Sequence, residues 1–189
     1  MTTKKQQTKQ CQQAITCFSL DQLAVLNDSV AVAEEMVCNF YKMSASQWLR
    51  HRYDVKTRAE LSGAEIVEGP FAQIVRYAAR GSDASLVSSV YDFYKICVQD
   101  PAILSVVSAT ADLSLFPFLV YVVVHELVHI VRFARFDQHF DAPPGEKERE
   151  EERVHRATRT ILARHDIAGM VPVLKFYGKW ETCQSPVDL

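Results

Sequence analysis

The stretch from Val120 to Val131, VYVVVHELVHIV, places three ionisable side chains in the middle of the most apolar part of the chain. Burying an unpaired charge or an imidazole without a hydrogen bond costs on the order of several kcal/mol, so the fold must supply a partner. His125 and His129 are four residues apart, and on an α-helix both rings project from one face at adjacent turns. That separation suits two nitrogens that share one tetrahedral zinc ion. The sequence therefore predicts a cation as the partner.

The apolar run around this motif indicates a buried core helix. From Leu113 to Val124 it extends for about 12 residues before His125 interrupts it, whereas a membrane span needs about 20. We expect one helix over residues 113–136, and its apolar character on nearly all sides places it at the centre of the protein. No membrane partner is predicted.

Composition limits the classes of protein that this chain can belong to. Its 189 residues suit one domain, and a hydrophobic share of 48% argues against disorder. A net charge of -2 lacks the basic excess that nucleic-acid binding requires, so no nucleic-acid partner is expected. The five cysteines are scattered, with no CxxC pair. We expect reduced thiols and a cytoplasmic location.

Turn-forming and helix-capping residues divide the chain into helix-sized segments. Residues 1–18, which lack the apolar region of a signal peptide, are predicted to be a flexible tail, and residues 19–189 a single α-helical metal-binding domain. Helices are expected over 21–42, between Pro70 and Gly81, over 83–98, from Asp100 onward, over 113–136 and after the DAPPG loop at 141–145. The segment VPVLKFYGKW is expected to be a strand or an irregular cover. The predicted fold is mainly α. It is a helical bundle around the central helix, which carries the HExxH motif of His125, Glu126 and His129, followed by a loop and a second metal-ligand helix.

A catalytic zinc site needs a third protein ligand and leaves its fourth position to water. Arg132 and Arg135 occupy the positions at which some metalloproteases carry a Gly and a third His on the same helix, so the ligand must come from elsewhere. Glutamates crowd the start of the next helix, at positions 146, 148, 150, 151 and 152. Most of them are expected to form a solvated first turn.

Helical phase reduces these glutamates to two. Extending the apolar face of the helix backward from Val154 reaches Glu151 and Glu150. We favour Glu151 because His155 lies one turn further along the same edge, where it can hydrogen-bond the ligands. Glu150 remains the alternative.

HELVH, followed by a loop and a helix that begins with glutamates, resembles the glutamate-zincin metallopeptidases, especially their small minimal members. The resemblance covers residues 120–162 and implies that His125, His129 and Glu151 bind Zn2+ and that Glu126 is the general base. The family often has ExxxD on the later helix, with the aspartate orienting a ligand; this chain has His155 in that position. Many members also carry a β-sheet before the motif helix, and none is expected here.

The resulting hypothesis is a zinc-dependent hydrolase that cleaves a peptide or amide bond in a peptide or protein substrate. A zinc-activated water would attack the carbonyl, with Glu126 as general base. Donors considered for the oxyanion are His155, Arg132 and Tyr177, and His155 is taken as a catalytic residue together with Glu126.

Two other classes stay open. The first is a helical di-metal oxidoreductase that uses the two ExxH pairs, Glu126–His129 and Glu152–His155, with Glu34 as a further carboxylate. The second is a binding module in which the metal serves structure only.

Overall fold

The structure, a computed structural model, describes residues 17–80, 90–135, 137 and 143–184. In chain order its elements are α1 (Leu20–Tyr41), α2 (Ala45–Trp48), β1 (Tyr53–Thr57), the short 3-10 turns η1 (Arg58–Glu60) and η2 (Gly63–Glu65), β2 (Ala72–Arg80), β3 (Val90–Val98), α3 (Asp100–Ala109), α4 (Leu115–Ala134), α5 (Pro144–Leu162) and α6 (Met170–Gln184). The predicted tail lies outside the described residues except for Cys17 and Phe18. Phe18 is buried in the core.

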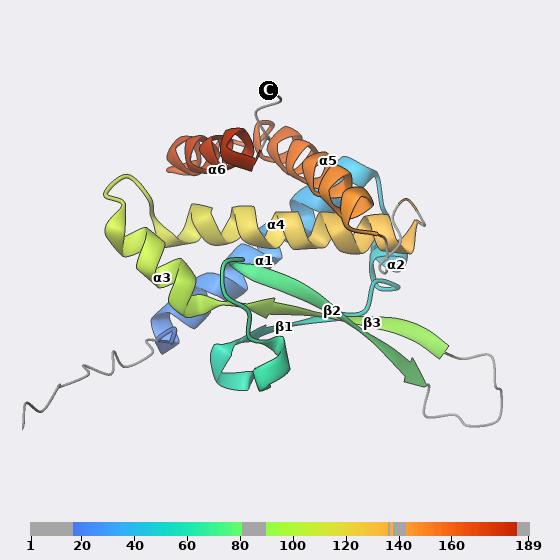
Figure 1. Cartoon of the computed structure of the whole chain (residues 1–189). Coiled ribbons are helices and arrows are strands. Elements are labelled where there is room, and N and C mark those ends of the chain that lie inside the picture. The colour runs from blue at the N-terminus through green and yellow to red at the C-terminus, as the bar shows by residue number, and fades with distance from the viewer. Residues whose placement is uncertain (1–16, 81–89, 136, 138–142, 185–189) are drawn as a thin grey trace, which may run out of the picture.

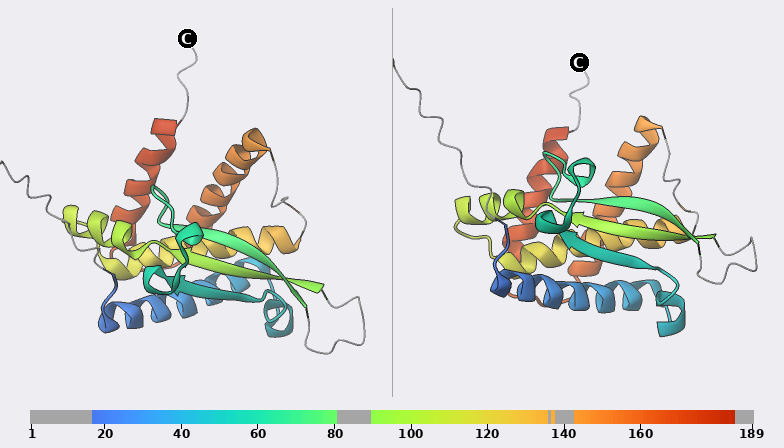
Figure 2. Two further views of the ribbon diagram at one scale, coloured as in Figure 1. Left: turned by 60° about the horizontal axis from the view of Figure 1, so that its bottom comes forward. Right: turned by 90° about the horizontal axis from the view of Figure 1, so that it is seen from below.

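Helix α4, which carries the HExxH motif, is the central element. It packs against α1, α3, α5, α6 and β2. Figure 1 shows the sheet on one side of α4 and helices α5 and α6 on the other, and the view from below in Figure 2 shows α1 alongside α4. Pro117 falls in the first turn, where its missing N–H breaks no helical hydrogen bond.

Among the described residues, α4 alone is long and apolar enough to cross a membrane by length and composition. The protein itself buries 83% of the apolar window in this helix, so most of its apolar surface packs against other elements.

The mainly α prediction is wrong, because the fold also contains a three-stranded sheet of order β1-β3-β2. The central strand β3 pairs in parallel with β1, with Val55 opposite Ile96, and antiparallel with β2, with Ile74 opposite Ile96. The chain reaches the sheet before it reaches α4, so a sheet does precede the motif helix.

The helices predicted between Pro70 and Gly81 and over 83–98 are strands in their described parts. Short apolar runs fit a helix or a strand equally well by spacing alone. Here Tyr94, Ile96 and Val98 are buried at every second position of β3, and the run is rich in the aromatic and β-branched residues that favour strands. Gly81, Asp83 and residues 84–89 lie outside the described residues.

The other elements differ less from the prediction. Helix α1 begins at Leu20, where Ser19 forms a capping box with Gln22, rather than at Asp21. The predicted strand or irregular cover near the C-terminal end is helix α6. The predicted helices at α3, α4 and α5 are present. Cys17, Cys38 and Cys97 are free thiols, while Cys11 and the side chain of Cys183 lie outside the described part of the chain.

Candidate metal centre

Two pairs of side chains, each spaced four residues apart on its own helix, face one another between α4 and α5. His125 and His129 project from α4, and Glu151 and His155 project from α5. His125 Nε2 lies 2.8 Å from Glu151 Oε1, and His129 Nε2 lies 3.2 Å from Glu151 Oε2. The two Nε2 atoms are 3.2 Å apart. The structure therefore brings together the three residues that the sequence analysis selected as metal ligands.

Two of these three separations are close to the spacing of ligand atoms around a small divalent ion, and the third, 2.8 Å between His125 and Glu151, is shorter. Zinc binds imidazole nitrogen and carboxylate oxygen at about 2.0–2.2 Å, so two ligand atoms of a tetrahedral site lie roughly 3.3–3.6 Å apart. The 3.2 Å between the two imidazoles and the 3.2 Å from His129 to the carboxylate come close to that spacing. One potential ligand atom from each of His125, Glu151 and His155 also lies within 4.8 Å of the others. The side chains can hold a metal ion.

The protonation states of two of these groups suit a metal site. Burial lowers the pKa of His125 and outweighs the opposing effect of Glu151, which favours the neutral imidazole. Burial works to raise the pKa of Glu151, but hydrogen bonds from His125 and His129 outweigh it and hold the pKa far below its usual range. Neutral imidazole and ionised carboxylate are the forms that bind metal. The Glu151 side chain is 46% exposed, so the cluster is open to solvent on the α5 side.

Glu126 is buried on α4 next to His125. Burial raises the pKa of Glu126 to about 7; the nearby His129 works in the lowering direction and Glu151 in the raising direction. A carboxyl group with a pKa near neutrality can accept and release a proton at physiological pH. The buried carboxyl group of Glu126 can therefore exchange a proton near neutral pH.

His155 is held by a partner that the sequence analysis did not identify. Its Nδ1 lies 2.9 Å from the Tyr121 hydroxyl, and its Nε2 lies 3.4 Å from Glu151 Oε1. The Tyr121 ring stacks on Tyr177 of α6 with a centroid distance of 3.7 Å. Tyr121 precedes His125 by four residues, so its place on the same helix face was the signal available in the sequence. Tyr177 packs through Tyr121 onto the site, and burial raises its pKa well above the usual value.

Glu150, the alternative third ligand, points to a different partner. Its carboxylate accepts hydrogen bonds from Arg132 Nε and, at 3.1 Å, from Arg153 Nη1. Burial works to raise the pKa of Glu150, but the two guanidinium groups outweigh it and lower the pKa. Arg132, considered as an oxyanion donor, is engaged in this ion pair.

The residues required for a di-metal site are not brought together. Glu152 is exposed. Glu34 accepts hydrogen bonds from Trp48 Nε1 and from the Tyr53 hydroxyl, on the sheet side of α1.

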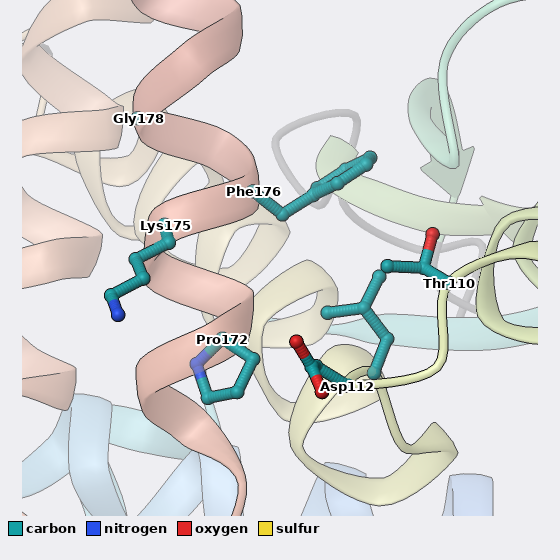
Figure 3. A pocket seen from close by; sticks show the side chains of 7 residues that line it. Thr110, Asp112, Pro172, Lys175, Phe176 and Gly178 are labelled. Atoms are coloured by element: carbon teal, nitrogen blue, oxygen red, sulfur yellow. The ribbon is translucent and has the colours of Figure 1, made fainter.

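Two pockets among the described residues lie away from His125, His129, Glu151 and His155. One, of about 380 Å³, lies between α6 and the connection from α3 to α4. Figure 3 shows Phe176 of α6 pointing across it toward Thr110. The other lies between α1, α2 and β1, around Trp48 and Tyr53. No residue of the cluster lines either pocket.

Comparisons with family models, with curated proteins and with solved structures found no match to this chain.

Proposed function

We propose that the protein is a zinc-dependent hydrolase of the metallopeptidase type, which cleaves a peptide or other amide bond. The observation that carries the proposal is the placement of one carboxylate, Glu151, against the Nε2 atoms of His125 and His129, whose separation of 3.2 Å is near that of two zinc ligands. A sheet before the motif helix is a feature that the resemblance to glutamate zincins implies, and this chain has one. The free thiols are in keeping with a cytoplasmic protein.

In this proposal His125, His129 and Glu151 would hold the ion. A bound zinc would supply an acidified water and a positive charge that polarises a carbonyl oxygen. Glu126 takes a proton from the attacking water and passes it to the leaving amine, so one C–N bond breaks and one C–O bond forms. A pKa of about 7 allows both transfers near neutral pH.

Stabilisation of the tetrahedral oxyanion requires a hydrogen-bond donor near the ion. Tyr177 is a candidate for that role because its ring stacks on Tyr121, which hydrogen-bonds to His155. His155 also borders the cluster. Arg132 is engaged by Glu150 and is not assigned to this step.

The test combines metal analysis with a single substitution. Protein purified without chelator should contain about one zinc ion per chain, and it should cleave a denatured protein such as casein or a mixed peptide library. Glu126→Gln should keep the zinc and lower turnover by at least about 100-fold, because the general base is lost. Glu148→Gln, an exposed position on α5, is the matched control and should behave as the parent.

The outcomes separate the alternatives. A parent protein that binds no zinc refutes the proposal. A parent that binds zinc and cleaves none of the substrates points to a metal-stabilised binding module, the alternative that the same ligand set also supports. Two iron ions per chain would indicate the di-metal oxidoreductase, against which the positions of Glu152 and Glu34 argue.

A further inference from the structure

We propose that His155 is a fourth protein ligand of the metal, so that the ion is held by three imidazoles and one carboxylate. The inference rests on the proposed metal site and changes its composition. Two residues from α4, His125 and His129, would face two from α5, Glu151 and His155. In the glutamate-zincin pattern that the sequence resembles, an aspartate in the position of His155 orients a ligand without being one.

The distances place His155 beside Glu151 and His125, with which it forms a group that could hold a metal ion. Its Nε2 lies 3.4 Å from Glu151 Oε1, and that same oxygen lies 2.8 Å from His125 Nε2. The His155 and His125 rings have their centroids 4.4 Å apart. Ligand atoms of a tetrahedral zinc site are separated by roughly 3.3–3.6 Å, so His155 is about as far from the carboxylate as a ligand would be.

The hydrogen bond with Tyr121 orients the His155 ring so that Nε2 faces the proposed ion. A metal-binding imidazole uses one nitrogen for the ion and donates the N–H of the other to a hydrogen-bond acceptor. At 2.9 Å the Tyr121 oxygen can accept from Nδ1–H, which leaves the Nε2 lone pair directed toward Glu151. Tyr121 is fully buried and stacked on Tyr177, so the hydroxyl has a fixed position.

His155 has a hydrogen-bond partner for its Nδ1 atom, whereas His125 of the HExxH motif has none among the described residues. The Nδ1 atom of His125 is buried and makes no hydrogen bond among the described residues. His155 has both of the features that a ligand histidine needs: a partner for Nδ1 and a carboxylate beside Nε2.

A fourth protein ligand changes how water reaches the ion. Zinc sites with four protein ligands are closed, and catalytic zinc sites keep a position for water or expand to five ligands. Hydrolysis at this site would therefore require water as a fifth ligand or in place of His155. The i,i+4 spacing on α5 keeps His155 beside Glu151.

X-ray absorption spectroscopy of the zinc-loaded protein tests the inference by counting imidazoles. The parent should show three imidazoles per zinc, and His155→Ala should show two. His165→Ala removes an exposed imidazole just beyond the end of α5 and is the matched control, for which three are expected. Zinc affinity should fall by more than about 100-fold in His155→Ala, and by about 10- to 100-fold in Tyr121→Phe, which removes only an outer partner.

Each result decides the question. Two imidazoles in the zinc-loaded parent overturn the inference and leave the proposed hydrolase intact, with His155 as an outer partner of Glu151. A parent that takes up no zinc overturns the inference and the proposed function together. If His155→Ala does not fold, the imidazole count of the parent still gives the answer.

Discussion

Arg132 of α4 and Glu150 of α5 form a partly buried ion pair next to the candidate metal ligands His129 and Glu151. Arg132 donates from Nε to the Glu150 carboxylate, and the next residue, Glu151, lies against the imidazoles of His125 and His129. Adjacent glutamates thus point to different partners, one to a guanidinium and one to the histidines. This pair and the Tyr121–His155 hydrogen bond both link α4 to α5.

Glu150→Gln and Glu151→Gln should have different effects. Glu151→Gln should strongly weaken zinc binding, because a neutral amide replaces the only carboxylate in the ligand set. Glu150→Gln should keep one zinc per chain but reduce the free energy of unfolding by about 2 kcal/mol, since it removes charge-assisted hydrogen bonds from a buried group. Elemental analysis and urea unfolding of both variants measure the two effects. Loss of zinc in Glu150→Gln with retention in Glu151→Gln would reverse the assignment.

Zinc should stabilise the folded protein. An ion that binds only the native state adds about 2.7 kcal/mol to the free energy of unfolding at a free concentration one hundred times its Kd. For a domain of this size that corresponds to an increase in Tm of about 5–10 °C. Thermal unfolding with and without chelator measures the shift, and His129→Ala should remove it. Magnesium, which prefers oxygen ligands, should have no such effect; an equal shift with magnesium would contradict the ligand set.

Glu65 should make stability depend on pH. Hydrogen bonds from Lys95, Tyr77 and the Ser62 backbone hold the pKa of Glu65 well below its usual 4.5. Because the folded-state pKa is the lower one, the stabilisation is fully present above about pH 5 and is lost as the pH falls through 4 and below. Glu65→Gln should therefore be less stable than the parent at pH 7, and the difference should shrink between about pH 5 and pH 3.

Urea unfolding at several pH values measures this difference. The control is Glu60→Gln, which removes an exposed partner of Lys56 and should change stability little. A difference between Glu65→Gln and the parent that stays constant with pH would show that the ionised carboxylate is not the source of the stabilisation.

Gly169, which precedes α6, should not tolerate a side chain. Its φ of +82° lies in the left-handed region, and an added Cβ would lie 3.0 Å from Ser114 Oγ and 3.2 Å from Pro117 Cγ. Gly169→Ala should lower the free energy of unfolding by about 1–2 kcal/mol from the backbone conformation alone. Gly145→Ala, in the first turn of α5 with nothing within 4 Å of the new methyl group, is the control. It should be neutral or slightly stabilising, and equal losses in the two variants would refute the steric explanation.

Local spacing was sufficient to predict the helices that carry the site. The apolar run of α4 and the i,i+4 spacing of His125 and His129 require no knowledge of the rest of the chain. The helical phase of α5 likewise distinguished the inward glutamates, 150 and 151, from Glu152. It could not choose firmly between Glu150 and Glu151, because both lie on the inner edge and the choice depends on where Arg132 lies on the facing helix.

The sheet was missed because strand pairing is not a local property. Residues 72–80 and 90–98 contain apolar residues at spacings that suit either a helix or a strand. Their state is decided by β3, which hydrogen-bonds to β1 on one edge and to β2 on the other. The prediction of a strand or irregular cover for α6 failed for a related reason. The helix is stabilised by tertiary packing, in which Phe176 contacts Phe118 and Tyr177 stacks on Tyr121.

The sequence by itself determined a buried helix with two imidazoles on one face, because a period of 3.6 residues converts spacing into direction. Only the tertiary structure decided which carboxylate those imidazoles meet, that a tyrosine holds a third imidazole beside them, and that a sheet covers the other side of α4. These features join residues that are far apart in the chain, and their positions are fixed by packing between elements rather than by the conformation of any one of them.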